Sequence, residues 1–509
     1  MKERRKNGYE QREADRKLKR KQEKREMSSK ERREANREDR QKARKKRARN
    51  KEFARVTYIF VILFIVMMGY ISYFNVAKSR EVISSPYNAR QDSYADRVVR
   101  GKILDKSGKI LADTKVAEDG TETREYPYGA MFAHVVGYAD QGKAGLESVA
   151  NFELLTSNAF FLEKLVTEFQ DKKNIGDNVV STLDVNLQEA AYNALGSSKG
   201  AAVVIEPSTG KILAMVSKPD FNPGAVASNW ESLNSSEESV LLNRATQGLY
   251  APGSTFKIVT LLEFMRENSG YTGYTYECSG AIEEEGTTIH CYNGKVHGSL
   301  DLRDSFAHSC NASFCNIGLS LDVSKFRSTA KELLFNKKLP SVLTASKSTF
   351  ALEESDGAAA EMMTAMGQGE TQVSPYHMAL ITSAIANDGK LMKPYLVDSV
   401  TNYTGTIIDK NKPEEYGELM TAEEASKLKD YMTSVVEYGT ASVLAGQSYT
   451  AAGKTGTAEY SSDKNKDHSW FVGIANVDHP DLVVSVIIEG SDGSSKAVNV
   501  AKAVFDAYY

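Results

Sequence analysis

The sequence has 509 residues, which is too long for one ordinary domain and predicts two or three folded units. Its formal net charge of −3 conceals a strong asymmetry, because residues 1–51 hold 24 Lys and Arg against 10 Asp and Glu. The chain beyond this basic tail is acidic, so the whole protein is not the polycation expected of a general nucleic-acid-binding protein.

The basic tail is followed by an apolar run. Residues 1–52 have few apolar side chains and cannot bury a core, so we predict a disordered tail or a solvated, charge-laced helix. Residues 56–74 carry no charge, and nineteen residues can span a bilayer of about 30 Å, so we predict a transmembrane helix over 53–77. A signal peptide is the competing interpretation, but no small-residue cleavage site is clear.

The charge pattern also predicts the topology. The Lys and Arg excess places the N-terminus in the cytoplasm and the chain after residue 77 outside a cell membrane that it crosses once. Nucleic-acid binding is the alternative role for so basic a tail, but beside a membrane span we expect it to face lipid headgroups.

Residues 78–175 predict a small extracytoplasmic pedestal. Residues 97–112 have the pattern of a β-hairpin that turns at residues 106–108. The segment contains no obvious catalytic cluster. We therefore expect it to hold the next domain away from the membrane.

Residues 178–509 predict the main domain, of the α+β class. Strand patterns occur near both of its ends, and a long, mostly helical stretch separates them. This order indicates one antiparallel sheet built from both ends of the domain, with an inserted helical lobe. The predicted elements are a helix over 184–195, a hairpin over 201–217, strands over 450–459, 469–477 and 482–489, and a final helix over 497–508.

A turn and a buried helix place a serine beside a lysine. Pro252 and Gly253 predict a turn, and the mostly apolar residues after it predict a buried helix that ends near residue 268. Burial disfavours the ammonium form of Lys257, while Ser254 lies three residues earlier on the same face. The pair therefore offers a hydroxyl nucleophile beside an amine of lowered pKa. The alternative is an N-cap serine followed by a lysine that reaches solvent.

Two further motifs carry polar side chains that could take part in catalysis or substrate binding. Ser309-Cys310-Asn311 lies between two helical stretches, where it can present a hydroxyl and a carboxamide or simply cap a helix. In the predicted strand 450–459, Lys454 and Gly456 should face one way and Thr455 and Thr457 the other. A lysine with two threonines suits recognition of a substrate carboxylate.

Together these motifs resemble those of the penicilloyl-serine transferases, in which S-x-x-K, S-x-N and K-T-G follow one another. The chain is similar in particular to the class B penicillin-binding proteins, which are monofunctional peptidoglycan D,D-transpeptidases. The resemblance covers roughly residues 95–509. Beyond the triplets it extends to residues 247–253, Gly367-Gln368-Gly369, Ser374-Pro375, residues 386–389, Ala458-Glu459, residues 470–473 and, in the pedestal, residues 100–105 and 145–147.

The resemblance implies a penicillin-binding transpeptidase fold of the β-lactamase-like kind and assigns each site residue a role. Ser254 would attack the carbonyl of a D-Ala-D-Ala stem peptide, release D-Ala and form an acyl-enzyme, with Lys257 as the base. Ser309 would relay a proton to the leaving amine beside the positive charge of Lys454. Binding of the substrate is implied for Asn311, Thr455, Gly456 and Thr457, and an oxyanion hole for the backbone N–H groups of Ser254 and Thr457.

The resemblance also implies partners and leaves alternatives. β-Lactams would bind covalently, and a membrane-embedded glycan polymerase of the SEDS type would supply the glycan strand. The alternatives are a β-lactamase, a D,D-carboxypeptidase, a β-lactam sensor without enzyme activity and an inactive scaffold. Cys310 stands where the β-lactamases have Asp, which disfavours the first of these.

The four cysteines admit three pairings. Cys278 and Cys291 flank a loop-like stretch and could form a disulfide, whereas Cys310 and Cys315 are expected to be buried thiols. The histidines show no ligand spacing, and His290 and His297 near Cys291 have the pattern of a structural loop pair. We therefore expect no cofactor and no metal.

Overall fold

The computed structural model describes residues 2–78, 96–160, 164, 169, 170, 172–459, 467–491 and 496–509. The chain divides into two compact units, Met1–Ile83 and Ser84–Tyr509. Residues 79–95, where the predicted pedestal begins, lie outside the described part.

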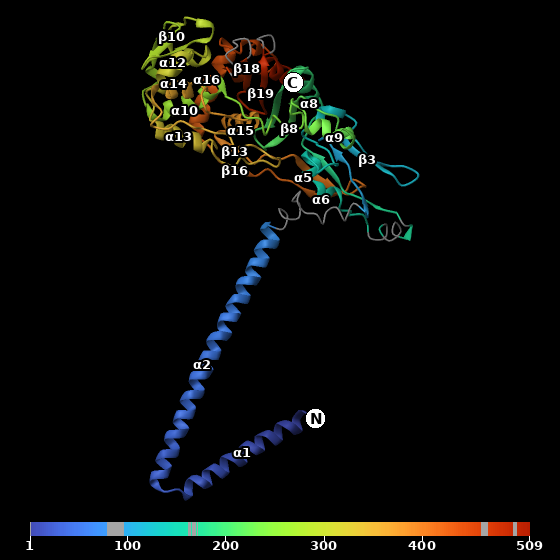
Figure 1. Ribbon diagram of the computed structural model, residues 1–509, viewed down its shortest axis with the longest axis vertical. Coiled ribbons are helices and arrows are strands. Elements are labelled where there is room, and N and C mark those ends of the chain that lie inside the picture. Colours follow the sequence, from blue (N-terminus) through green and yellow to red (C-terminus); the bar gives the residue numbers. More distant parts are fainter. Residues whose placement is uncertain are drawn as a thin grey trace. The chain divides into compact units, whose positions relative to one another are not determined.

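The first unit is helical. It consists of α1 (Lys2–Glu26), α2 (Ser29–Tyr73) and the π-helical turn η1 (Phe74–Lys78) (Figure 1). Ser28 begins α2 with a capping box, in which its backbone N–H donates to Glu31 Oε2 over 2.8 Å. Of the two alternatives for residues 1–52, the structure has the helix. Among the described residues, only the helical stretch Ser29–Val76 is long and apolar enough to cross a membrane.

A five-stranded antiparallel sheet is the core of the second unit. The strand order is β17-β18-β19-β7-β8. The first three strands come from the end of the chain and the last two from a hairpin near residue 200, as the sequence predicts. Their bounds are β7 Gly200–Glu206, β8 Lys211–Lys218, β17 Ala451–Glu459, β18 Asp467–Ala475 and β19 Leu482–Ser491.

Helices pack against this sheet and form the lobe between its two halves. The N-terminal α8 (Val185–Leu195) and the C-terminal α17 (Ala497–Tyr508) contact each other and the sheet. The intervening helices are α9 Val226–Asn234, α10 Lys257–Glu267, α11 Leu302–Ala307, α12 Asn311–Gly318, α13 Val323–Glu332, α14 Gly357–Ala365, α15 Pro375–Ala386 and α16 Ala422–Glu437.

A second sheet joins the pedestal segment to the later chain. Its order is β15-β14-β6-β2-β3-β4, and the predicted hairpin is confirmed by the pairing of β2 with β3. Strands β14 and β15 arrive from beyond residue 390, so this sheet is not made by residues 78–175 alone. The bounds are β2 Ile103–Leu104, β3 Ile110–Val116, β4 Glu122–Glu125, β6 Asn178–Ser181, β14 Val397–Thr401 and β15 Ile407–Lys410.

Buried charge ties the pedestal strands to a short helix. Glu147 in α5 (Gly145–Val149) is fully buried and accepts hydrogen bonds from Arg100 Nε over 2.6 Å and from Arg124 Nε over 2.7 Å. Because both of its carboxylate oxygens are paired with a guanidinium, the charge is tolerated in the interior. The remaining short elements here are β1 Val98–Val99, β5 Asn174–Ile175, α6 Asn151–Leu154 and η2 Gly129–Phe132.

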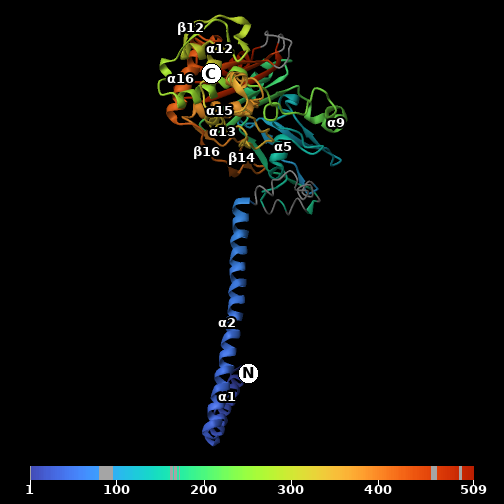
Figure 2. The same cartoon turned by 60° about the vertical axis from the view of Figure 1, so that its left-hand side comes forward.

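Four short strands form a separate small region beside α12. Strand β9 (Thr275–Cys278) pairs with β12 (Gly298–Asp301), and β10 (Ala281–Glu284) pairs with β11 (Thr287–His290). Contacts join α12 to β9, β10 and β11, and α11 to β12; Figure 2 labels α12 and β12 in the same part of this unit. The other short elements of this unit are η3 Pro223–Ala225, η5 Tyr271–Gly273, η6 Tyr292–Gly294, η7 Ser442–Leu444, β13 Lys390–Met392 and β16 Glu415–Glu418.

Candidate active site

Ser254 lies in a tight 3-10 turn, η4 (Gly253–Phe256), which leads directly into the buried helix α10. The turn is anchored from two sides: Gly253 N–H donates to the Gly367 carbonyl over 2.8 Å, and Trp470 Nε1 donates to the Ala251 carbonyl over 3.0 Å. Ser254 itself is half-buried. The predicted turn and helix are therefore confirmed, with the serine in the turn.

Strand β17 approaches this turn so closely that glycine is required on both sides. Gly253 has φ of +52°, and a Cβ there would lie 2.4 Å from the Thr457 carbonyl oxygen. A Cβ on Gly456 would lie 3.0 Å from Thr255 Cγ2 and 3.1 Å from the Pro252 carbonyl oxygen. The absence of a Cβ at Gly456 thus allows the strand to pack closely against the serine turn.

Lys257 is fully buried and its amine touches the second motif. Its Nζ donates to the Ser309 carbonyl over 2.8 Å, to Asn311 Oδ1 over 2.8 Å and to Ser309 Oγ over 3.3 Å. Burial lowers the pKa of Lys257 to about 8, although thiols of neighbouring cysteines act in the opposite direction. The amine can therefore exchange a proton near neutral pH.

The Ser309-Cys310-Asn311 motif turns the chain from α11 into α12. Ser309 has φ of +57°, a left-handed conformation that is rare outside glycine and that presents both its carbonyl and its hydroxyl to Lys257. Cys310 caps α12 by accepting from the Ser313 N–H, and Asn311 Nδ2 donates to the His290 carbonyl over 3.1 Å. The motif does cap a helix, but the capping side chain is that of Cys310 and not the Ser309 or Asn311 side chain expected of an N-cap.

The side chains of β17 alternate as predicted. Lys454 is fully buried, whereas Thr455 is half-buried and Thr457 is exposed. Lys454 Nζ donates to the Thr455 carbonyl over 3.1 Å. Burial, with the charge of Lys257 as the second cause, holds the pKa of Lys454 well below its usual value. The charge of Lys257 therefore acts on an amine from a distant part of the chain.

Three residues of the site have no counterpart among the sequence predictions. Thr440 Oγ1 and Thr455 Oγ1 share a hydrogen bond of 2.5 Å, and Thr440 N–H donates to the Ala307 carbonyl over 3.1 Å. The rings of Phe314 and Phe306 lie beneath the amines of Lys257 and Lys454, at 5.3 and 5.5 Å. No local motif marks these positions, because each acts through a partner far along the chain or on another element.

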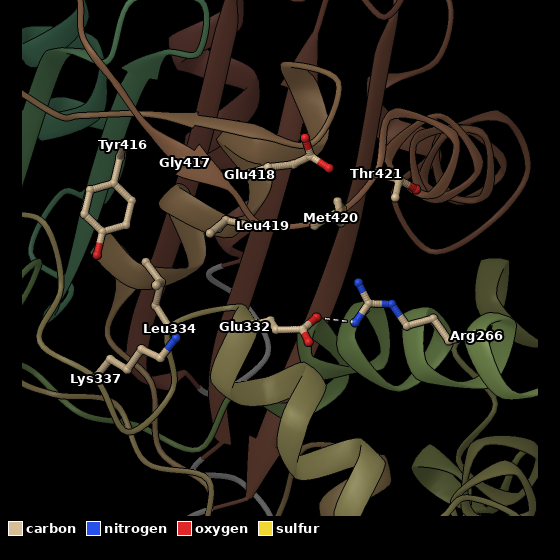
Figure 3. Close-up of a pocket in the computed structure, with 10 residues that line it drawn as sticks. All are labelled: Arg266, Glu332, Leu334, Lys337, Tyr416, Gly417, Glu418, Leu419, Met420 and Thr421. Carbon is tan, nitrogen blue, oxygen red and sulfur yellow. Dashed lines mark hydrogen bonds and ion pairs between the residues drawn. The ribbon is translucent and has the colours of Figure 1, made fainter.

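A separate hollow of about 520 Å³ lies away from these residues (Figure 3). Arg266 and Glu332 both line it, point toward each other and form an ion pair of 2.7 Å. None of the serine, lysine or threonine side chains of the three motifs lines it. The Ser254 turn and the buried amines of Lys257 and Lys454 are therefore the candidates for the chemistry, and this hollow is not.

Comparisons with known proteins agree with this geometry. Residues 200–507 match the family model described as the penicillin binding protein transpeptidase domain, and residues 100–179 match that of the penicillin binding protein A dimerisation domain. The peptidoglycan D,D-transpeptidase PbpA of Mycolicibacterium smegmatis is 30% identical over 492 residues, covering 90% of this chain and 99% of that protein.

Two solved structures share the fold. The D,D-transpeptidase domain of a peptidoglycan glycosyltransferase from Eggerthella lenta is 34% identical with a TM-score of 0.72, covering 81% of this chain and 99% of that one. The penicillin G acyl-enzyme complex of penicillin-binding protein A from Mycobacterium tuberculosis is 28% identical with a TM-score of 0.72, covering 80% and 99%. The relatives thus include a protein whose structure was solved as an acyl-enzyme.

Proposed function

The chain belongs to the penicillin-binding protein transpeptidases and is a serine-type peptidoglycan D,D-transpeptidase, and from this premise we propose the role of each site residue. The observation that carries the proposal is the buried Lys257 amine, which lies one turn after Ser254 and contacts both Ser309 and Asn311. A buried amine of lowered pKa beside a hydroxyl is the arrangement that activates a serine.

In the acylation step, Ser254 Oγ attacks the carbonyl carbon of the D-Ala-D-Ala bond while the neutral Lys257 amine takes the hydroxyl proton. The C–O bond of the ester forms, the C–N bond breaks, and D-Ala leaves after its nitrogen receives a proton through Ser309. The buried Lys454 adds positive potential near this proton path. The backbone N–H groups of Ser254 and Thr457 stabilise the oxyanion, each contributing roughly 3 kcal/mol to lowering the barrier.

Substrate binding falls to the open side of β17 and to Asn311. Thr455 and Thr457 face outward and offer hydroxyls to the terminal carboxylate, with Thr455 oriented by Thr440. Asn311 offers its amide to the substrate backbone. A second stem peptide then attacks the acyl-enzyme with its amine, which restores Ser254 and completes the cross-link. β-Lactams acylate Ser254 by the same step and stay bound.

The cellular setting follows from the N-terminal helix. We infer a single membrane span in α2, with the basic tail in the cytoplasm and residues 84–509 outside. A glycan polymerase of the SEDS type is the proposed partner. The basis is the family resemblance, which implies that glycan polymerisation belongs to a partner.

Intact mass spectrometry of the full chain tests the proposal. After one dose of benzylpenicillin we expect a single stable adduct that is absent in Ser254→Ala and present in Ser228→Ala, an exposed serine of α9. With a D-Ala-D-Ala peptide and an acceptor amine, the enzyme should release D-Ala and form the joined product. An adduct that hydrolyses within seconds would indicate a β-lactamase instead, and no adduct would refute acyl-serine chemistry.

A further inference from the structure

Four potential metal ligands gather directly behind the Ser309-Cys310-Asn311 motif. The Sγ atoms of Cys278, Cys291 and Cys310 and a ring nitrogen of His297 all lie within 4.8 Å of one another. The three cysteines are buried and His297 is half-buried. All three thiols are free, so the disulfide that the sequence allowed between Cys278 and Cys291 is not formed.

The distances within the cluster are those of a tetrahedral metal site. Cys278 Sγ and Cys291 Sγ are 3.7 Å apart, as are Cys291 Sγ and Cys310 Sγ, and Cys278 Sγ lies 3.5 Å from His297 Nδ1. Around tetrahedral zinc, with Zn–S bonds of about 2.3 Å, two sulfurs lie about 3.8 Å apart and a sulfur and a nitrogen about 3.6 Å apart. A disulfide would instead need about 2.05 Å.

We propose that Cys278, Cys291, His297 and Cys310 bind one zinc ion in a closed, structural Cys3His site. Three thiolates and an imidazole form a soft ligand set, which selects zinc over the hard cations magnesium and calcium. Four protein ligands complete the tetrahedron and leave no position for water or substrate. The ion therefore holds structure and takes no part in the acyl transfer.

The ligands come from four different places in the small β9–β12 region. Cys278 ends β9, Cys291 precedes η6, His297 precedes β12 and Cys310 caps α12. Among the residues that the structure describes, the buried apolar side chains clustered with these cysteines are Leu300 and Ala312. Strands this short with so small a core need a further cross-link, and a metal ion supplies one.

Backbone groups already support the sulfur atoms as thiolates. Gly280 N–H donates to Cys278 Sγ and Ser313 N–H donates to Cys310 Sγ, each over 3.4 Å. Cys315 differs, because its thiol donates to the Met362 carbonyl over 3.5 Å and it is not among the four clustered ligands. The chain thus contains a buried cysteine that serves as a matched control.

The site would couple metal binding to the geometry of the catalytic motif. Cys310 stands between Ser309 and Asn311, the two residues that Lys257 contacts. Cys291 follows His290, whose carbonyl accepts the Asn311 amide. A metal that joins Cys291 to Cys310 therefore holds both ends of this hydrogen bond. Cys310 and His297 act as positioning residues, whereas the Ser254 turn is held independently by Gly367 and Trp470.

This proposal replaces the expectation that the chain binds no metal. The ligands are separated by twelve, five and twelve intervening residues, unlike the close Cys and His pairs that mark zinc sites in a sequence. The fold brings them together only because β9 pairs with β12 and β11 leads into η6.

Metal analysis of the full chain, purified without added metal or chelator, gives the first test. We expect elemental mass spectrometry to find about one zinc ion per chain. Cys278→Ser and His297→Ala should lose most of it, and Cys315→Ala should keep it. Absence of metal in the wild-type chain, or a stoichiometric metal other than zinc, would refute the proposal.

A second measurement uses only the wild-type protein, so it does not require any variant to fold. Iodoacetamide is added to the native wild-type protein before and after treatment with a zinc chelator, and the labelled cysteines are mapped. Zinc ligation predicts that the thiols of Cys278, Cys291 and Cys310 are protected from iodoacetamide before the chelator is added and labelled after it. The release of zinc should accompany the gain in labelling. Labelling before treatment, or a Cys278–Cys291 disulfide in the mass spectrum, would overturn the site.

The link to the active site has its own readout. Removal of zinc should lower the rate of Ser254 acylation by benzylpenicillin about tenfold or more, and added zinc should restore it. Zinc content and cysteine protection are measured without any turnover, so failure of the metal site and failure of the proposed enzyme activity are distinguishable. An unchanged acylation rate in zinc-free protein would refute the positioning role.

Discussion

The Lys257 amine donates a 2.8 Å hydrogen bond to the side-chain oxygen of Asn311, although 54 positions separate the two residues. Asn311 in turn donates to the His290 carbonyl, which orients its oxygen toward the lysine. The carboxamide is therefore a fixed acceptor for the Lys257 amine, which we propose as the base, besides its proposed contact with substrate.

Asn311→Ala should impair acylation more than folding. The change removes one of the three acceptors around the buried amine, and we expect about a hundredfold slower acylation by benzylpenicillin. Stopped-flow measurement of adduct formation checks this. Asn316→Ala, on the same helix, is the control and should acylate nearly as fast as the wild type. Equal rates in the two variants would contradict the role.

Acylation should accelerate with rising pH through about 8. Burial lowers the pKa of Lys257 to about 8, while Cys310, Cys315 and Cys291 raise it and the buried Lys454 lies nearby. Only the neutral amine can take the Ser254 proton, so the competent fraction is small below this pH and saturates above it. Acylation rates measured from about pH 6 to 9 test the sign. A rate that is flat or falls across this range would exclude Lys257 as the base.

Gly253→Ala should destabilise the serine turn. The residue has positive φ, and the new Cβ would lie 2.4 Å from the Thr457 carbonyl oxygen, so strand or turn must move. We expect a loss of about 2 kcal/mol of unfolding free energy and severely reduced acylation. Gly270→Ala, where a Cβ meets nothing within 4 Å, is the matched control in denaturant titrations. Indistinguishable midpoints would show that the close approach is not needed.

Thr440→Val should affect substrate binding and leave the fold intact. Valine keeps the shape but removes the hydroxyl that shares a hydrogen bond with Thr455. Without this partner the Thr455 hydroxyl is less well oriented toward a carboxylate. We therefore expect the second-order rate constant of acylation to fall about tenfold. The melting temperature should remain within a few degrees of the wild type. Acylation unchanged at low β-lactam concentration would argue against this role.

Glu147→Gln should destabilise the pedestal. The neutral amide leaves Arg100 and Arg124 buried without a negative partner, at a cost of about 3–5 kcal/mol. Glu125→Gln breaks the exposed pair with Lys115, which solvent screens, and should lower the melting temperature far less than Glu147→Gln does. Thermal melting of both variants compares the two pairs. A smaller loss for Glu147→Gln than for Glu125→Gln would refute the buried triad as a stabilising element.

Periodicity and turn residues predicted the strands of the main sheet and several of its helices from the sequence alone. The hairpin of β7 and β8, the strands β17 to β19 and the helix α10 were all predictable, because their apolar spacing and their Pro and Gly turns are local. Ser254, Lys257 and the alternation of Lys454 with Thr455 were predictable for the same reason. The nineteen uncharged residues of α2 likewise needed no tertiary information.

Only the tertiary structure decided what lies next to these motifs. The Lys257–Asn311 contact, the hydrogen bond from Thr440 to Thr455 and the strands that β14 and β15 add to the pedestal sheet join residues remote in the chain. The cysteines show this most clearly: their spacing left a Cys278–Cys291 disulfide open, whereas the paired strands place three thiols and one imidazole at the distances of a metal site. Sequence spacing reports neighbours within one element, and contacts between elements depend on how those elements pack.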